Sequence, residues 1–272
     1  MKFFSFFLVC TIGAGMYAQS FTKVLSGPMV STPGDSRSVN WVDVNNDGFL
    51  DCMITNGPNG GQNNTLFFNN GNGGFNSLTG DSIVLDNKPS DGAAWADTDN
   101  DGDEDCFVVN WYGANNLFYK NNGSGGFVKI NSGALVTDGG FSETASWGDY
   151  DNDGLVDLYV TNSAGTLQNF LYKNMGISGF LKVVGGDVVT DAFQSRSVNW
   201  TDMDLDGDLD LFVTNEGGQN ENVYRNDGNG VFNRIFTGTL VNGGGNTMSS
   251  SWGDYDNDGD LDVFLANDLS NN

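Results

Sequence analysis

The sequence predicts an all-β protein, a β-propeller of about 52-residue, four-stranded blades. Three observations predict it. An acidic phrase recurs five times at a steady interval, short apolar strands and Gly/Asn turns recur around it, and no segment shows a helical period. A β-sandwich is the rival architecture, but a sandwich does not repeat one unit so faithfully.

The acidic phrase sets the period of the repeat. Its copies are WVDVNNDGFLD, WADTDNDGDED, WGDYDNDGLVD, WTDMDLDGDLD and WGDYDNDGDLD. The first Asp of each copy is residue 43, 97, 149, 202 or 254, so the steps are 54, 52, 53 and 52 residues. A spacing this regular is typical of repeat proteins, in which each unit is one supersecondary structure.

The segments around the phrase supply the four strands of each unit. A Ser-rich alternating stretch precedes the phrase, as in SRSVNW at 36–41 and again at 195–200. An apolar run ending in Asn follows, as in CFVVN at 106–110. A hairpin with a Gly/Asn turn closes the unit, and its second strand opens with Phe.

The two ends of the chain bear on how many blades are expected. FTKVLSG at 21–27 resembles the last strand of a unit, and the fifth unit stops after its second strand. We therefore expect four complete blades plus partial ones over residues 19–272, incomplete at the C-terminus, as a fragment of a longer protein. A closed five-bladed ring is the alternative.

Residues 1–18 read as a secretory signal, because Lys2 precedes a mostly apolar run and Ala18 suits cleavage. A lipoprotein anchor at Cys10 is a weaker interpretation, since small residues do not precede it. No later stretch is apolar and long enough for a transmembrane segment. The sequence thus predicts a secreted or surface-exposed protein.

Net charge limits the partners. The chain has 35 acidic and 11 basic residues, a formal charge of -24, so nucleic acid and anionic membranes would be repelled. The acids are concentrated in the repeated phrases, whose positions 1, 3, 5 and 9 are Asp or Asn and whose position 6 is Gly. These candidate metal ligands are Asp43, Asn45, Asp47, Asp51, Asp97, Asp99, Asp101, Asp105, Asp149, Asp151, Asp153, Asp157, Asp202, Asp204, Asp206, Asp210, Asp254, Asp256, Asp258 and Asp262.

Clustered carboxylates repel one another, and a hard divalent cation reverses that repulsion. Calcium prefers six to eight oxygen ligands, and a loop with oxygens at alternate positions and Gly at the bend suits it. The chain has no His, which disfavours zinc and copper. We predict up to five Ca²⁺ ions, with the first loop weakest because Asn45 replaces a carboxylate. Position 12 lies in a strand and is apolar, so the loops are not EF-hands.

The Trp, the D-x-[DN]-x-D-G-x-x-D loop, the apolar strand ending in Asn and the hairpin together resemble the FG-GAP/VCBS repeat family, similar to the integrin α N-terminal propeller. The resemblance covers residues 21–272. It implies that the blades are a fragment of a seven- or eight-bladed ring. It also implies calcium in the loops between the first two strands of each blade, and an extracellular adhesion or ligand-binding role.

Other residues carry weaker expectations. Five Trp at one repeat position are expected to pack between blades, and Cys52 and Cys106 to be buried apolar residues rather than a disulfide. Trp111 and Tyr112, in a loop, are candidate ligand-binding residues. Catalysis has little support without His or an evident unique polar cluster. The predicted partner is an extracellular protein or glycan; a carbohydrate-binding or polysaccharide-degrading propeller is the alternative.

Overall fold

Four antiparallel four-stranded sheets and one two-stranded sheet make up the computed structural model, which describes residues 22–57 and 59–269. Each sheet is one predicted blade, and its strands are hydrogen-bonded in chain order. Blades 1 and 2 comprise β1 (Ser36–Val42), β2 (Asp51–Asn56), β3 (Thr65–Asn69), β4 (Phe75–Ser77), β5 (Ser90–Ala96), β6 (Asp105–Asn110), β7 (Leu117–Asn121) and β8 (Phe127–Ile130). Blades 3, 4 and 5 comprise β9 (Ser142–Gly148), β10 (Asp157–Asn162), β11 (Phe170–Asn174), β12 (Phe180–Lys182), β13 (Ser195–Thr201), β14 (Asp210–Asn215), β15 (Asn222–Asn226), β16 (Phe232–Ile235), β17 (Thr247–Gly253) and β18 (Asp262–Asn267).

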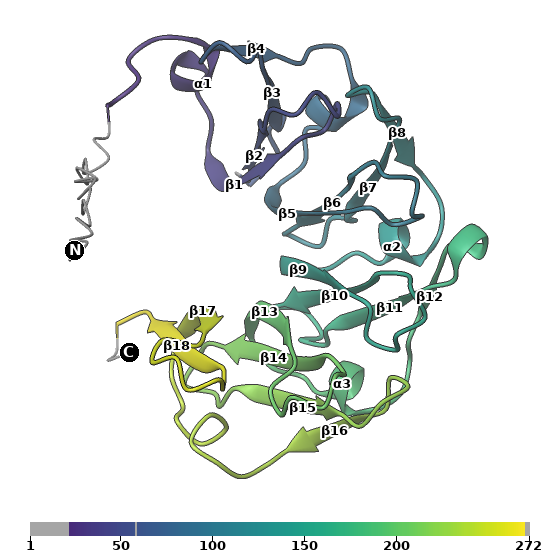
Figure 1. Ribbon diagram of the computed structural model, residues 1–272, viewed down its shortest axis with the longest axis vertical. Coiled ribbons are helices and arrows are strands. Elements are labelled where there is room, and N and C mark those ends of the chain that lie inside the picture. Colours follow the sequence, from purple (N-terminus) through teal and green to yellow (C-terminus); the bar gives the residue numbers. More distant parts are fainter. Residues whose placement is uncertain (1–21, 58, 270–272) are drawn as a thin grey trace, which may run out of the picture.

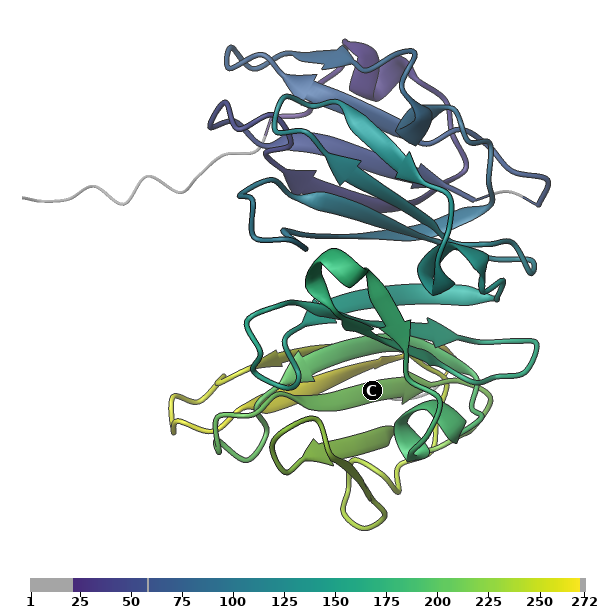
Figure 2. The same cartoon turned by 90° about the vertical axis from the view of Figure 1, so that its right-hand side faces the viewer.

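The blades follow one another around an arc, as Figure 1 shows. The first strand of each four-stranded blade lies on the inner side of the arc and the fourth strand on the outer side. Turned by 90°, the same strands run roughly parallel to the axis, so the connecting loops gather at the two ends of the blades (Figure 2). The propeller-like fold predicted from the repeat is therefore confirmed.

Short helical turns, which the sequence did not predict, occupy connections outside the sheets. They are α1 (Pro28–Ser31), α2 (Ala134–Thr137), α3 (Asp187–Thr190) and the 3-10 turns η1 (Ser82–Val84) and η2 (Gly176–Ser178). Residues 22–27 form no strand, so the expected N-terminal strand is wrong for the part of it that the structure describes. The predicted signal at 1–18 lies outside the described residues. No helix in the described part of the chain has the length and apolarity to cross a membrane.

Cores lie between neighbouring blades. The second strand of each of blades 2, 3 and 4 is buried along its whole length, because another blade covers each of its faces. Trp95, Trp147, Trp200 and Trp252 pack against four successive interblade clusters, as expected. Trp41 is 52% exposed, because no described blade covers that side of β1. Cys52 and Cys106 are buried free thiols, as predicted.

Hydrogen bonds from one Asn per blade reinforce these seams. Asn121, Asn174 and Asn226 end the third strands of blades 2, 3 and 4, and the side-chain amide of each donates to a backbone carbonyl in the acidic loop of the preceding blade. The acceptors are the oxygens of Val44, Thr98 and Tyr150, at 2.9, 2.8 and 2.7 Å. We call these three contacts the asparagine bridges.

Candidate metal centre

The acidic loops connect the first and second strands of each blade and share one internal geometry. The position 1 carboxylate accepts hydrogen bonds from the backbone N–H groups of positions 5 and 6. In the third loop, Asp149 accepts from Asp153 at 3.0 Å and from Gly154 at 2.9 Å. The same pair of bonds occurs in all five loops. Each loop is thereby curled around its first Asp.

The position 9 Asp starts the second strand and is buried in blades 1 to 4. In the third loop, Asp157 accepts from the backbone N–H of Asn174 at 2.7 Å and of Tyr150 at 3.3 Å. Burial, the largest influence, raises the pKa of Asp157 to about 7, against the lowering effect of these two bonds. Burial also raises the pKa of Asp51 and of Asp210. The position 9 carboxylate therefore connects the acidic loop to the third strand of the same blade, because it accepts a backbone hydrogen bond from each.

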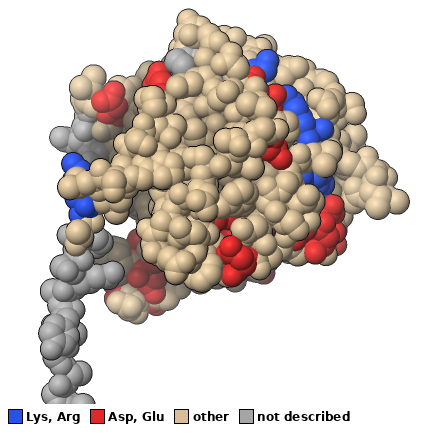
Figure 3. Space-filling model, turned by 90° about the horizontal axis from the view of Figure 1, so that it is seen from above, with Lys and Arg blue, Asp and Glu red and all other residues tan. Residues whose placement is uncertain are grey.

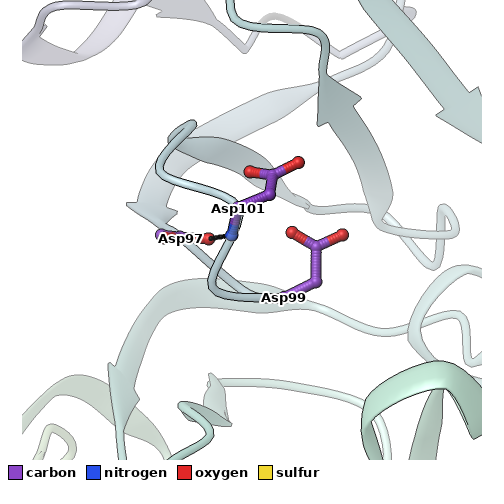
Figure 4. A group of neighbouring side chains, drawn as sticks. All are labelled: Asp97, Asp99 and Asp101. Carbon is purple, nitrogen blue, oxygen red and sulfur yellow. Dashed lines mark hydrogen bonds between the residues drawn. The ribbon is translucent and has the colours of Figure 1, made fainter.

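Four loops bring carboxylate oxygens together closely enough to hold one metal ion. In each, three carboxylates have oxygens within 4.8 Å of one another; these groups are Asp97, Asp99 and Asp101, then Asp149, Asp151 and Asp157, then Asp202, Asp204 and Asp206, then Asp254, Asp256 and Asp262. Figure 4 shows the second loop, with the three Asp side chains around one turn of backbone. Among the described residues the first loop forms no such group, since Asn45 occupies position 3 and donates to Asp47 at 3.1 Å.

One carboxylate oxygen in the third loop has no partner within the protein. Asp151 Oδ1 is buried and has no hydrogen-bond partner in the structure. A buried carboxylate oxygen without a partner is costly. Asp151 belongs to a group made only of carboxylates, which are the ligands that hard divalent cations prefer. The residues present thus fit a divalent ion.

Lysines approach two of the loops. Lys120 Nζ lies 2.8 Å from Asp99 and 2.7 Å from Asp105, and Lys173 Nζ contacts Asp151 and Asp153. The hydrogen bond to Asp151, the largest influence, raises the pKa of Lys173. In blade 4 the equivalent Arg225 instead pairs with Asp227 outside the loop, at 2.6 Å. The ammonium groups offset part of the negative charge in the second and third loops only.

We expect Lys173→Met to have opposite effects with and without calcium. In the absence of calcium, the loss of both ion pairs lowers the melting temperature. In its presence, the calcium ion no longer competes with the ammonium group, so the third loop binds calcium on the order of tenfold more tightly. Calorimetric titration measures this, with Lys182→Met as control because Lys182 pairs with Asp138, away from the loops. Weaker calcium binding in Lys173→Met would mean that the lysine supports the ion.

Position 4 of every loop adopts the left-handed backbone region. Its φ is 56° at Asn46, 59° at Asn100, 57° at Asn152 and 63° at Asn257, but the fourth loop places Leu205 there with φ 58°. Asn tolerates this region better than Leu does. The amides also link loops: Asn46 donates to Asp103 at 2.7 Å and Asn152 to Asp208 at 2.6 Å.

Leu205→Asn is therefore expected to stabilise the protein by about 0.5–1 kcal/mol. Leu205 is 58% exposed, so the substitution removes little buried apolar surface. Urea unfolding measures the free energy. Leu50→Asn is the control, since Leu50 is an exposed leucine of the first acidic loop with ordinary backbone angles. An equal gain in both variants would mean that replacing any exposed leucine with a polar side chain stabilises the protein, whatever its backbone angles.

Trp111 and Tyr112 lie at the opposite end of blade 2 from its acidic loop, just after β6. The Trp111 indole donates to Glu143 Oε1 at 2.8 Å and lies edge-on to Phe141 and Tyr112. With Arg37, Gly57, Asp91, Glu143 and Arg196 they line a cavity of about 240 Å³. The expectation that no unique polar cluster exists was wrong. One repeat position could have revealed this cluster in the sequence. It is the residue after the first Ser or Thr of each inner strand, which differs between the repeats: Arg37, Asp91, Glu143, Arg196 and Met248.

The fold and the loops define a class: a blade-repeat protein with a cluster of carboxylates between the first two strands of successive blades. The FG-GAP-like repeat family matches residues 43–108, 97–160, 149–213 and 202–265. Since these matches span most of the chain, the protein belongs to the FG-GAP-like repeat family.

Solved structures resemble the chain only distantly. An Agrocybe aegerita lectin that recognises non-reducing terminal N-acetylglucosamine matches with 21% identity and a TM-score of 0.48, over 84% of this chain and 56% of the lectin. The Vibrio cholerae biofilm matrix protein Bap1 matches with 16% identity and a TM-score of 0.48, over 85% of this chain and 34% of Bap1. A Photorhabdus luminescens Tc holotoxin pore matches with 18% identity and a TM-score of 0.43, over 82% and 10%. No curated protein matches the chain.

Proposed function

We propose that this protein is an exported, calcium-binding β-propeller that serves as an adhesion or ligand-binding module. The observation that carries the calcium proposal is the recurrence of one carboxylate cluster at the same place in four successive blades. A single acidic turn is common on protein surfaces. Four clusters in register, one of them with a buried partnerless oxygen on Asp151, favour a shared ligand.

The donor atoms favour calcium over other metals. Every candidate side-chain ligand is an oxygen, the chain has no His, and both described cysteines are buried free thiols within the second strands. Such a set suits a large, hard cation that accepts six to eight oxygens, whereas magnesium keeps more of its water. When bound, calcium would supply positive charge to loops that otherwise repel themselves. Asp43, Asp47 and Asp51 would hold a fifth, weaker ion together with Asn45.

Two observations favour an extracellular setting. The predicted signal at 1–18 would direct export, and loops of this kind need bind calcium only at about 0.1–1 mM, the extracellular range. Acidic side chains form separate patches rather than an even coat (Figure 3), which leaves uncharged surface for a protein or glycan partner. We assign the ligand-binding role to the loops, because blade proteins present variable residues there on a rigid scaffold.

Calorimetric titration of the metal-free chain with calcium, and separately with magnesium, tests the metal proposal. We expect four or five calcium ions with dissociation constants of about 0.1–1 mM, and weaker magnesium binding. Asp202→Ala should remove one calcium ion from the count, because Asp202 curls the fourth loop and contributes to its cluster. Equal binding of both metals, or none at millimolar calcium, would overturn the proposal.

A further inference from the structure

We infer that the cavity lined by Arg37, Gly57, Asp91, Trp111, Tyr112, Glu143 and Arg196, here called the axial pocket, binds the end group of a neutral carbohydrate. The inference deepens the proposed ligand-binding function and rests on it. Four inner strands and two loops build this pocket, so it exists only once successive blades have assembled.

The axial pocket lies far from the acidic loops. Its charged residues occupy the starts of β1, β5, β9 and β13, whereas the acidic loops follow the ends of these seven-residue strands. At about 3.3 Å per residue the two regions are roughly 20 Å apart, at opposite ends of the blades. Binding in the pocket therefore does not use the calcium ligands.

β-Bulges present these charged side chains. The pairing of first and second strands shifts register at Arg37, Asp91 and Arg196, and likewise around Glu143. A bulge re-aims a side chain that regular pleating would place on a blade face. In blades 1, 3 and 4 the N–H group that follows is satisfied by a Thr hydroxyl, as Ser38 donates to Thr55 Oγ1 at 3.1 Å. The distortion recurs in every blade, but the residue it displays differs.

Glu143 is held rigidly before any ligand arrives. Its Oε1 accepts from Trp111 Nε1 and from Arg196 Nη1, both at 2.8 Å, and from the Ser163 hydroxyl. The side chain is only 6% exposed. Burial, the largest influence, raises the pKa of Glu143 to about 7, with the neighbouring Asp91 adding to it and Arg196 opposing it. Fixed polar groups of this kind lower the entropic cost of binding.

Arg37 and Tyr112 leave the entrance open. The Arg37 side chain is 43% exposed, donates to the carbonyl of Gly57 at 3.3 Å and lies 3.8 Å from Asp91. A guanidinium has five N–H donors, so Arg37 has donors to spare for a ligand. Tyr112 is 43% exposed and held with φ 56°, in a region that a bulky residue seldom adopts. Backbone strain of this kind gathers at binding sites.

The charge and size of the pocket select the ligand class. Two arginines and two carboxyl groups line the pocket, and Glu216 lies 3.8 Å from Arg196. The carboxyl groups offset the arginine charge, so an anion gains little by entering, and the two arginines disfavour a cation. Hydroxyl groups both donate and accept, and thus match arginine donors beside carboxylate acceptors. The exposed Tyr112 ring offers an apolar face to a sugar ring. A volume of about 240 Å³ is below that of drug-sized sites and suits one terminal ring rather than a polymer.

Tryptophan fluorescence tests this, because Trp111 contacts the pocket directly. The calcium-loaded chain is titrated with glucose, galactose, mannose, fucose and N-acetylglucosamine, and with glucuronate and arginine methyl ester as charged probes. We expect at least one neutral sugar to bind. Glu143→Gln, Arg37→Ala and Tyr112→Ala should each weaken that binding at least about tenfold. Arg37 and Tyr112 are at the rim, so their variants test the pocket even if Glu143→Gln fails to fold.

Glu221→Gln is the matched control. Glu221 is also a buried glutamate, but it accepts from Thr247 and from the backbone of Asn215 in blade 4. It should leave sugar binding unchanged. Failure of every neutral sugar to bind a chain that still binds calcium would overturn the pocket inference alone. Binding of only a charged probe, or sugar binding that survives all three pocket variants, would overturn it too. Loss of calcium binding would instead count against the proposed function.

Discussion

Calcium at 2 mM should raise the melting temperature of this protein by roughly 15–30 °C over its value in chelator. A site with a dissociation constant of about 0.1 mM contributes RT ln 21, about 1.8 kcal/mol, at this concentration. Four such clusters together contribute about 7 kcal/mol. For a chain of this length each kcal/mol corresponds to roughly 2–4 °C.

The physical reason is that metal-free loops store repulsion. Each cluster holds carboxylate oxygens within 4.8 Å of one another, and the chain carries a net charge of -24. Differential scanning calorimetry in calcium, in magnesium and in chelator measures the shift. The gain should appear with calcium and only weakly with magnesium at the same ionic strength. Coincident melting curves in calcium and chelator would contradict the metal assignment while leaving the fold intact.

Replacing Asp157 with Ala should destabilise the protein by about 2–5 kcal/mol even in chelator. The buried carboxylate accepts the backbone N–H groups of Asn174 and Tyr150, and Ala leaves both without that acceptor. Part of this loss is offset, because the substitution also removes a buried carboxylate whose desolvation is unfavourable and raises the pKa of Asp157. Urea unfolding in chelator measures the loss.

Asp151→Ala separates ligation from structure in the same loop. Asp151 pairs with Lys173 and makes no backbone hydrogen bond, and its Oδ1 is the buried atom without a partner. In chelator the substitution should change stability little, because loss of the ion pair is offset by reduced repulsion. In calcium the substitution should lower the free energy of unfolding by the contribution of one calcium site, about 1.8 kcal/mol. Equal losses for Asp151→Ala in both buffers would show that its role is structural.

The repeat predicted the fold and the acidic loops because both are periodic. One phrase with Trp, alternating Asp and Gly specifies a first strand, a loop and a second strand, and five copies in register leave few other arrangements. The register of the strands, the start of each fourth strand at a Phe and the burial of Cys52 and Cys106 follow from the same pattern.

The axial pocket escaped this reasoning because it depends on what the repeats do not share. Arg37, Asp91, Glu143 and Arg196 are more than fifty residues apart from one another, and only the curvature of the blades brings their strand starts together. Comparing each repeat position for chemical variation, rather than for similarity, would have singled them out. The asparagine bridges were likewise hidden, since nothing in a single repeat shows that its Asn reaches the preceding loop.

The asparagine bridges also provide a route by which the proposed calcium sites would influence one another. The Asn174 amide holds the Thr98 carbonyl of the second loop, while its backbone N–H holds Asp157 of the third. Asn121 and Asn226 repeat this connection at the seams on either side. An ion that orders one loop therefore lowers the entropy cost of ordering the next, as in a one-dimensional array of coupled units. Calcium should consequently fill the loops with a Hill coefficient above one. Asn174→Ala should lower that coefficient by weakening the coupling between the second and third loops, which the Asn100 amide still links through the Gly154 carbonyl at 3.1 Å.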